Sequence, residues 1–188
     1  DVVSAISVGM QPISNAMYIG AGMLPWTPMF AWETPLEPKT PDFSVNPRMS
    51  LNPTFGIDIV SSIDQQVLGM DRMSQLKFWM EQPDIECLVM SINDEPAGYV
   101  FVSSNGIIGP AAVLSEQDIE TLLIATTKKI RDMGVDHVSI KVAGLSPSTY
   151  KAVRQLGLKI AGTAFIVLSS RPLWNIGCYI PSSGDALF

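Results

Sequence analysis

The spacing of apolar residues along the chain predicts a series of helices and strands. Apolar side chains recur every three or four residues over 58–82, which is typical of amphipathic helices, and Gly69 divides this stretch into two. Short apolar runs bounded by turn residues then predict three strands, at Cys87–Ile92, 97–103 and 107–113. This region is therefore expected to place two helices before a run of three strands.

The pattern changes to alternating helices and strands after residue 114. Ser115 and Asp118 have the spacing of a capping box, so we expect a helix that begins there and ends at Gly134. The elements expected after it are a strand at 138–142, a helix from Pro147 to Gly157 with Ser146 as its cap, and strands at 159–169 and 178–180. Three strands followed by such an alternation predict an α/β fold with a mixed sheet flanked by helices.

Residues 3–30 repeat the pattern of residues 138–165. Six of the 28 aligned pairs are identical, and they join Val3 to Val138, Ser4 to Ser139, Gly9 to Gly144, Pro12 to Pro147, Gly22 to Gly157 and Phe30 to Phe165. Average residue usage would give about two identities by chance. Each copy predicts a strand, a helix that begins at a proline and ends at a glycine, and a second strand.

The two copies differ in what comes before them, and this difference predicts the domain organisation. About ninety residues of further elements lead to the second copy, whereas almost nothing leads to the first. We therefore predict that residues 1–34 are the C-terminal remnant of a first domain and that residues 55–188 form a complete second one. Five prolines between Thr34 and Pro53 predict a linker over 35–54.

Composition narrows the possible functions. The formal net charge is −6 and no cluster of Lys and Arg is present, which argues against a nucleic-acid partner. No apolar run reaches the ~20 residues that a membrane helix needs. Cys87 and Cys178 suggest neither a disulfide framework nor a metal site, so we expect a cytoplasmic protein without a metal.

Several short motifs resemble the GNAT (Gcn5-related N-acetyltransferase) superfamily, and in particular proteins with two GNAT domains in tandem. The resemblance covers nearly the whole chain apart from the proline-rich linker. It implies a mixed, mostly antiparallel sheet flanked by helices. The motifs that carry it are Gln11-Pro-Ile-Ser-Asn-Ala-Met-Tyr18, Gly22-Met-Leu-Pro25, the spacing of Asp64, Gly69 and Arg72, Gly98-Tyr99, Ile108-Gly-Pro110 and Ser170-Arg-Pro172.

The resemblance also implies an activity and a set of site residues. Such enzymes transfer an acetyl group from acetyl-CoA to an amine, here a small-molecule or amino-acid-like acceptor. Tyr18 stands four residues before Gly22, where the family places a tyrosine that protonates the departing thiolate. Gln11 stands where a polar residue contacts the cofactor and Asn15 lies one helical turn from it, so we expect both to bind the cofactor. The alternative for Tyr18 is a helix tyrosine that packs its ring and leaves its hydroxyl in water.

The predicted second domain departs from the family pattern at two places. The expected loop before its long helix, 109–116, has no Gly-x-Gly; it has Pro110, which lacks an amide, and Glu116, which is negative where a phosphate would lie. Val153 stands where a catalytic tyrosine would be expected. The alternative function is therefore a non-catalytic GNAT-fold scaffold, ligand-binding module or dimerisation module.

Two further expectations concern contacts. Residues 1–34 are too short to bury their own apolar face, so we expect them to dock on residues 55–188 of the same chain or of a second copy in a homodimer. Asp64 and Glu86 are further candidates for carboxylates that face the amine.

Overall fold

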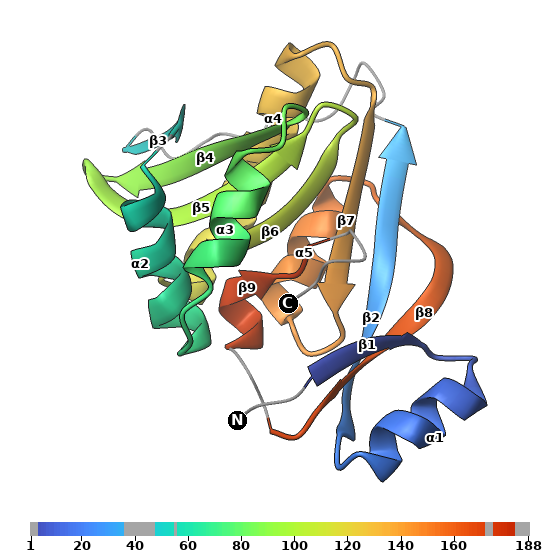
Figure 1. Ribbon diagram of the computed structural model, residues 1–188. Helices are drawn as coiled ribbons and strands as arrows, with labels where there is room; N and C mark the ends of the chain where they lie inside the picture. The colour runs from blue at the N-terminus through green and yellow to red at the C-terminus, as the bar shows by residue number, and fades with distance from the viewer. Residues whose placement is uncertain (1–3, 36–47, 55, 172–174, 183–188) are drawn as a thin grey trace.

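The computed structural model describes residues 4–35, 48–54, 56–171 and 175–182 (Figure 1). The expected helices and strands are all present in these ranges. The helices are α1 (Pro12–Gly20), α2 (Ile57–Leu68), α3 (Met73–Met80), α4 (Ile119–Asp132) and α5 (Pro147–Gln155), with short 3-10 turns at Glu116–Asp118 and Ile176–Cys178. The strands are β1 (Ser4–Val8), β2 (Leu24–Pro35), β3 (Met49–Pro53), β4 (Ile85–Ile92), β5 (Glu95–Ser103), β6 (Ile107–Val113), β7 (His137–Ala143), β8 (Lys159–Ser169) and β9 (Tyr179–Ile180).

One mostly antiparallel sheet runs through the described part of the chain. Its strand order is β1-β8-β2-β7-β6-β5-β4-β3, and β9 pairs with β6 beside this path. The only parallel pair among these neighbours joins β6 to β7, through Ile107 with Ser139 and Ile108 with Ile140. The predicted mixed sheet flanked by helices is therefore confirmed.

Helices cover both faces of the sheet, and each face has its own apolar core. The cluster with α4 and α5 includes Leu122, Leu123 and Val153, and takes Leu88 from β4. The cluster with α2 and α3 takes the neighbouring Val89, because successive side chains of a strand point to opposite faces. This alternation explains why the central strands have few polar positions.

The two predicted repeats interleave within the sheet. The first repeat is β1-α1-β2 and the second is β7-α5-β8. Strand β8 lies between β1 and β2, while β2 lies between β8 and β7. Exchanging the two repeats therefore reproduces the order of these four strands, as an approximate twofold axis would. Residues 4–34 pack on later residues of the same chain, as one of the two alternatives predicted for residues 1–34.

Backbone hydrogen bonds around the two helices follow the same repeat. The carbonyl of Tyr18 accepts from the amide of Met23 at 3.1 Å, and the carbonyl of Val153 accepts from the amide of Leu158 at 2.9 Å. Equivalent bonds also start from the amides of Gln11 and Ser146, Asn15 and Tyr150, and Gly22 and Gly157. Tyr18 and Val153 are thus structurally equivalent, as their aligned positions predicted.

Three local expectations need correction. Part of the predicted linker, Met49–Pro53, forms the edge strand β3, which tolerates Pro53 because an edge strand leaves backbone groups unpaired. Neither Ser115 nor Ser146 makes a side-chain cap hydrogen bond. A 3-10 turn separates Ser115 from α4, and the hydroxyl of Ser146 bonds instead to the hydroxyl of Thr149 at 2.6 Å.

Candidate functional site

The three predicted site residues lie along one side of α1. Gln11 precedes the helix and is exposed, while Asn15 and Tyr18 are half-buried and follow at spacings of four and three residues. The side-chain Nδ2 of Asn15 donates to the carbonyl of Gly9 at 3.2 Å, and its Oδ1 is buried without a hydrogen-bond partner in the part of the chain that the structure describes. One side of the helix region therefore carries three polar side chains, and one of them has a buried acceptor without a described partner.

The equivalent side of α5 carries Ser146 and Tyr150 at the positions of Gln11 and Asn15, but an apolar residue at the position of Tyr18. Val153, which corresponds to Tyr18, is completely buried and belongs to the core beneath α4. Its neighbour Ala152 is also fully buried. A side chain that could exchange a proton with a ligand is therefore present at this position in the first repeat and absent from it in the second.

Strands β6 and β7 part after their two-residue parallel pairing, and β9 occupies the space beside β6. Ala111 pairs with Ile180, and Ala112 pairs with Tyr179. The edge that the parting would expose is therefore already hydrogen-bonded to the chain itself. A Cβ on Gly109 would lie 2.5 Å from the carbonyl oxygen of Pro181, so the C-terminal segment follows β6 at close range. An extended ligand cannot pair with this stretch of β6 unless β9 leaves.

Pro110 lies within β6, not in a loop before the long helix as the sequence suggested. The pairing of β5 with β6 shifts between Val100 and Val102, opposite Gly109 and Pro110. Such an irregularity lets a strand contain a proline, since the bulged residues need no ladder hydrogen bond. The loop that does precede the helical region consists of Leu114 and Ser115 alone.

The start of α4 is unfavourable for a phosphate group. Glu116 and Asp118 form the 3-10 turn that leads into the helix, where an anion would otherwise be attracted by the helix dipole. Glu116 Oε1 accepts a hydrogen bond from the hydroxyl of Ser148 at 2.8 Å. Desolvation raises the pKa of Asp118 above its usual value. Negative side chains thus take the place that a pyrophosphate would need.

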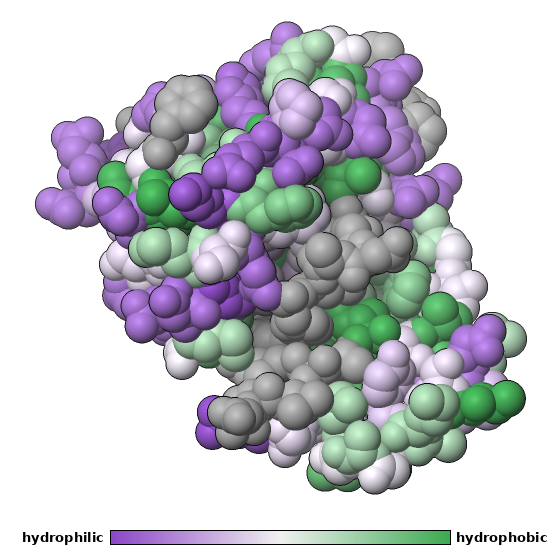
Figure 2. Space-filling model, viewed as in Figure 1, coloured by the Kyte–Doolittle hydropathy of each residue, from purple (hydrophilic) through white to green (hydrophobic). Residues whose placement is uncertain are grey.

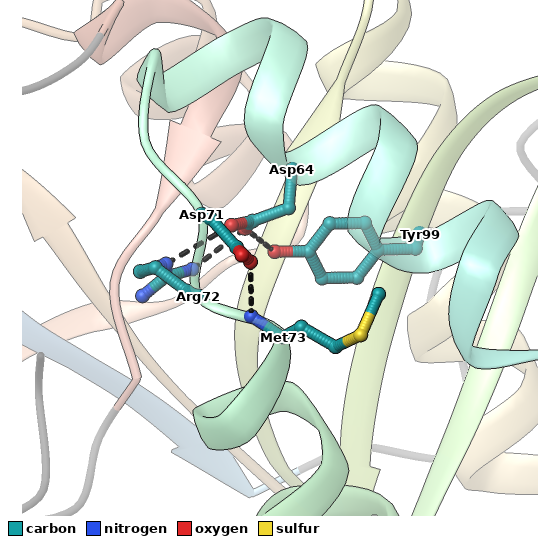
Figure 3. Close-up of polar contacts among 5 residues, drawn as sticks. All are labelled: Asp64, Asp71, Arg72, Met73 and Tyr99. Carbon is teal, nitrogen blue, oxygen red and sulfur yellow. Dashed lines mark hydrogen bonds and ion pairs between the residues drawn. The ribbon is translucent and has the colours of Figure 1, made fainter.

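A buried polar cluster joins α2 to the loop before α3 and to β5 (Figure 3). Arg72 donates from Nε to Asp64 Oδ2 at 3.0 Å and from Nη2 to Asp64 Oδ1 at 2.6 Å. The hydroxyl of Tyr99 donates to Asp64 Oδ1, and the Arg72 guanidinium lies 5.3 Å from the centre of the Tyr179 ring. Asp64 is fully buried, so it cannot face an amine substrate, contrary to the sequence-based expectation.

The side chains of this cluster fix one another's protonation states. Burial lowers the pKa of Arg72, but Tyr179 and Asp64 outweigh that effect and leave it above its usual value. Burial, reinforced by Asp64, raises the pKa of Tyr99 well above its usual value. Arg72 therefore stays charged and Tyr99 stays neutral, which suits a structural ion pair that fixes α2, α3 and β9 against the sheet. The spacing of Asp64 and Arg72 in the sequence therefore corresponds to a structural ion pair between α2 and the start of α3.

Glu86, the other predicted carboxylate, lies in a surface cavity of about 460 Å³. Its Oε2 is 3.9 Å from Lys129 Nζ, and both side chains are about one-third exposed. Cys87 also lines the cavity, and burial followed by the charge of Glu86 raises its thiol pKa to about 12. A protonated thiol at neutral pH is a poor nucleophile, so Cys87 does not make this cavity a nucleophilic site.

Neither a metal centre nor a membrane span is found among the described residues. These residues contain no group of three or more His, Cys, Asp or Glu side chains that could hold a metal ion. No helix within the described ranges has the length and apolar character needed to cross a membrane.

Comparison with known proteins gives matches to the structure but none to the sequence. No model of a known protein family matches the sequence, and no curated protein matches it either. Solved structures do match. A Pyrococcus horikoshii protein provisionally described as an acetyltransferase superposes on 100% of this chain and 60% of its own, with a TM-score of 0.74 and 17% identity. A GCN5-related N-acetyltransferase from Sphaerobacter thermophilus matches 94% of this chain and 62% of its own, with a TM-score of 0.61 and 15% identity.

The chain has the GNAT fold. A GCN5-related N-acetyltransferase from Kribbella flavida matches it over 88% of this chain and 67% of its own, with a TM-score of 0.54 and 13% identity. Identities this low establish the GNAT architecture alone. The chain spans about 60% of the length of the first two matched structures.

Proposed function

We propose that the natural polypeptide containing this chain transfers an acetyl group from acetyl-CoA to a small-molecule or amino-acid-like amine. The GNAT fold supports an acetyltransferase in general. The contrast between Tyr18 and Val153 carries the proposal, because only the first repeat has an ionisable hydroxyl at this helix position. We therefore assign the chemistry to the unit of which α1 is a part.

The proposed reaction needs one proton at the departing sulfur. The amine nitrogen attacks the thioester carbonyl carbon, the C–S bond then breaks, and Tyr18 gives its hydroxyl proton to the sulfur as the thiolate leaves. The amine passes its own extra proton to water, and the Tyr18 phenolate takes a proton back from water. Gln11 and Asn15 hold the thioester substrate in this proposal, and Gln11 does so through an exposed side chain.

Residues 55–188 have a different proposed role, that of a non-catalytic GNAT-fold scaffold. The pairing of β9 with β6 and the acidic turn before α4 both oppose cofactor binding in this unit. Val153 provides no proton. In this proposal the second repeat lends its strands to the sheet that supports α1.

The test compares two tyrosine variants of the natural polypeptide. Acetyl-CoA affinity is measured by calorimetry, and release of free CoA is followed with a panel of primary amines and amino acids. Tyr18→Phe should lower kcat by a factor of about 10²–10⁴ and leave the acetyl-CoA dissociation constant unchanged. Tyr150→Phe makes the same chemical change on α5 and should keep the normal rate.

The possible failures can be told apart. If the natural polypeptide binds no acetyl-CoA, the acetyltransferase proposal is wrong. If it is active but Tyr18→Phe keeps the full kcat, the activity stands and the role of Tyr18 is wrong.

A further inference from the structure

Helix α1 turns its polar side toward the sheet and its apolar side toward solvent. Ser14, Asn15 and Tyr18 are half-buried, whereas Met10 and Met17 are 80% and 70% exposed. Met10, Ile13 and Met17 form one stripe at spacings of three and four residues, and Ile13 is 77% exposed. Figure 2 shows hydrophobic side chains gathered over the corner of the molecule that α1 occupies in Figure 1. An amphipathic helix at a protein surface normally turns its apolar side inward and its polar side to water. The exposed stripe on α1 therefore indicates a surface that another part of a protein covers.

The second repeat shows what covers the equivalent surface there. Helix α5 packs against α4, and Ala152, which corresponds to Met17, is 0% exposed. Strand β7, which corresponds to β1, pairs with β6 along the edge that faces away from β2. In the first repeat, β1 ends the described sheet and pairs with β8 alone. No helix or strand in the described ranges thus fills, in the first repeat, the positions that α4 and β6 fill in the second.

The sequence of the first repeat suits burial. Residues 2–32 contain no Asp, Glu, Lys, Arg or His. The equivalent stretch of the second repeat carries four cationic side chains, namely Lys141, Lys151, Arg154 and Lys159. Strand β2 is inside the sheet, but most of α1 is exposed, and an exposed helix without any charge is unusual because charged residues normally make up about a quarter of a globular protein.

We infer that the outer side of α1 and the free edge of β1 dock a second helix-and-strand unit that resembles α4 and β6 and lies upstream in the same polypeptide. The docked strand extends the sheet beyond β1, and the docked helix covers Met10, Ile13 and Met17. The matched Pyrococcus horikoshii protein is long enough to contain such a unit outside the match, since this chain covers 60% of its length. A second copy of this chain cannot supply this cover from its own α4 and β6, because they already pack on its α5 and β7.

Methionine oxidation tests this inference without any assay of activity. The 188-residue protein and the natural polypeptide are treated with hydrogen peroxide, and each methionine is followed by peptide mass spectrometry. Met10 and Met17 report on the proposed surface, Met133 at the end of α4 is an exposed reference, and Met23 is a buried one. In the natural polypeptide, Met10 and Met17 should oxidise at least about tenfold more slowly than in the 188-residue protein, while Met133 is unchanged.

Two results would overturn the inference. Equal oxidation of Met17 in both proteins would show that the surface stays open to water. Protection of Met17 in the 188-residue protein that increases with protein concentration would show that a second copy covers it. The readout does not depend on acetyl transfer, so it stands or falls separately from the proposed function.

Discussion

The carbonyl groups of Tyr18 and Val153 accept equivalent hydrogen bonds, yet the two side chains lie in different environments. Tyr18 is half-buried on a helix without buried residues, whereas Val153 is completely buried beneath α4. The same backbone position therefore serves a polar side chain in one repeat and the core in the other.

This difference predicts unequal effects of exchanging the two residues in the 188-residue protein. Val153→Tyr should destabilise it by about 3 kcal/mol or more, because the larger ring overpacks the core and its hydroxyl loses water. Tyr18→Val should cost less than about 1 kcal/mol, since little buried area is lost. Urea unfolding followed by circular dichroism measures both. Equal losses of unfolding free energy in the two variants would contradict the finding that Val153 is buried and Tyr18 is only half-buried.

The buried ion pair should matter far more than an exposed one. Asp64→Ala leaves the Arg72 guanidinium buried without its partner and should cost about 3–5 kcal/mol of unfolding free energy. Lys151→Ala is the control: it removes a 2.7 Å ion pair with Glu120 in which Lys151 is 63% exposed, and it should cost no more than about 1 kcal/mol. Similar losses for the two variants would show that the cluster in Figure 3 does not hold α2 to the sheet.

Two glycines with the same backbone conformation should respond differently to alanine. Gly106 and Gly134 have φ angles of +86° and +80°, so alanine is strained at both by about 1 kcal/mol. A methyl group on Gly106 would also overlap the carbonyl oxygen of His137, whereas nothing lies within 4 Å of one on Gly134. Gly106→Ala should therefore lower the stability by at least about 2 kcal/mol more than Gly134→Ala. Matching thermal midpoints for the two variants would show that the turn before β6 tolerates displacement.

Stability should fall as the pH rises above about 9. Burial raises the thiol pKa of Cys87 from 9.0 to about 12, and it also raises the pKa values of Tyr99 and Tyr179 from 10.0. Between the unfolded and folded pKa values the unfolded chain loses protons that the folded chain keeps, so alkali favours unfolding. Each group contributes at most about 1.4 kcal/mol per pH unit. Urea titrations at about pH 7, 9 and 10.5 measure the slope, and Cys87→Ala should reduce it. A flat profile up to about pH 10.5 would contradict the assigned burial of these groups.

Removal of residues 1–35 should prevent the remaining chain from folding cooperatively. Strand β8 lies between β1 and β2, so the deletion removes both of its neighbours in the sheet, and it also removes the β2 neighbour of β7. The shortened protein should show a broad thermal transition and should aggregate, since one edge of β7 and both edges of β8 become open. Size-exclusion chromatography and thermal melting followed by circular dichroism check this. A monomer with a sharp transition would show that residues 36–188 fold independently.

Much of the fold was predictable because local patterns decide the elements. The helices around Gly69 and the strands over 87–113 follow from apolar spacing and turn residues, and the repeat follows from identical residues at glycine and proline positions. The interleaving of β2 between β7 and β8 was not predictable in this way. Pairing between strands more than 100 residues apart leaves no periodic signal in one sequence.

The candidate site was only partly accessible from the sequence. The shared helix side of Gln11, Asn15 and Tyr18 follows from their spacing. By contrast, the blockage beside β6 depends on where the two-residue strand β9 pairs, and no local feature of Tyr179 and Ile180 specifies Ala111 and Ala112 as their partners. Asp64 was a candidate for a carboxylate that faces the amine, and its spacing from other residues did not show that its side chain is buried.

The interleaved order of strands also bears on how the protein is made. During translation, β2 leaves the ribosome before any part of β7 or β8 exists, and residue 169 follows residue 35 by 134 positions. At about 5–20 residues per second, roughly ten seconds pass before the last partner emerges. Throughout that interval the uncharged segment 2–32 lacks the strands with which it pairs in the folded protein. We therefore expect a ribosome-associated chaperone to bind this segment while the rest of the chain is made.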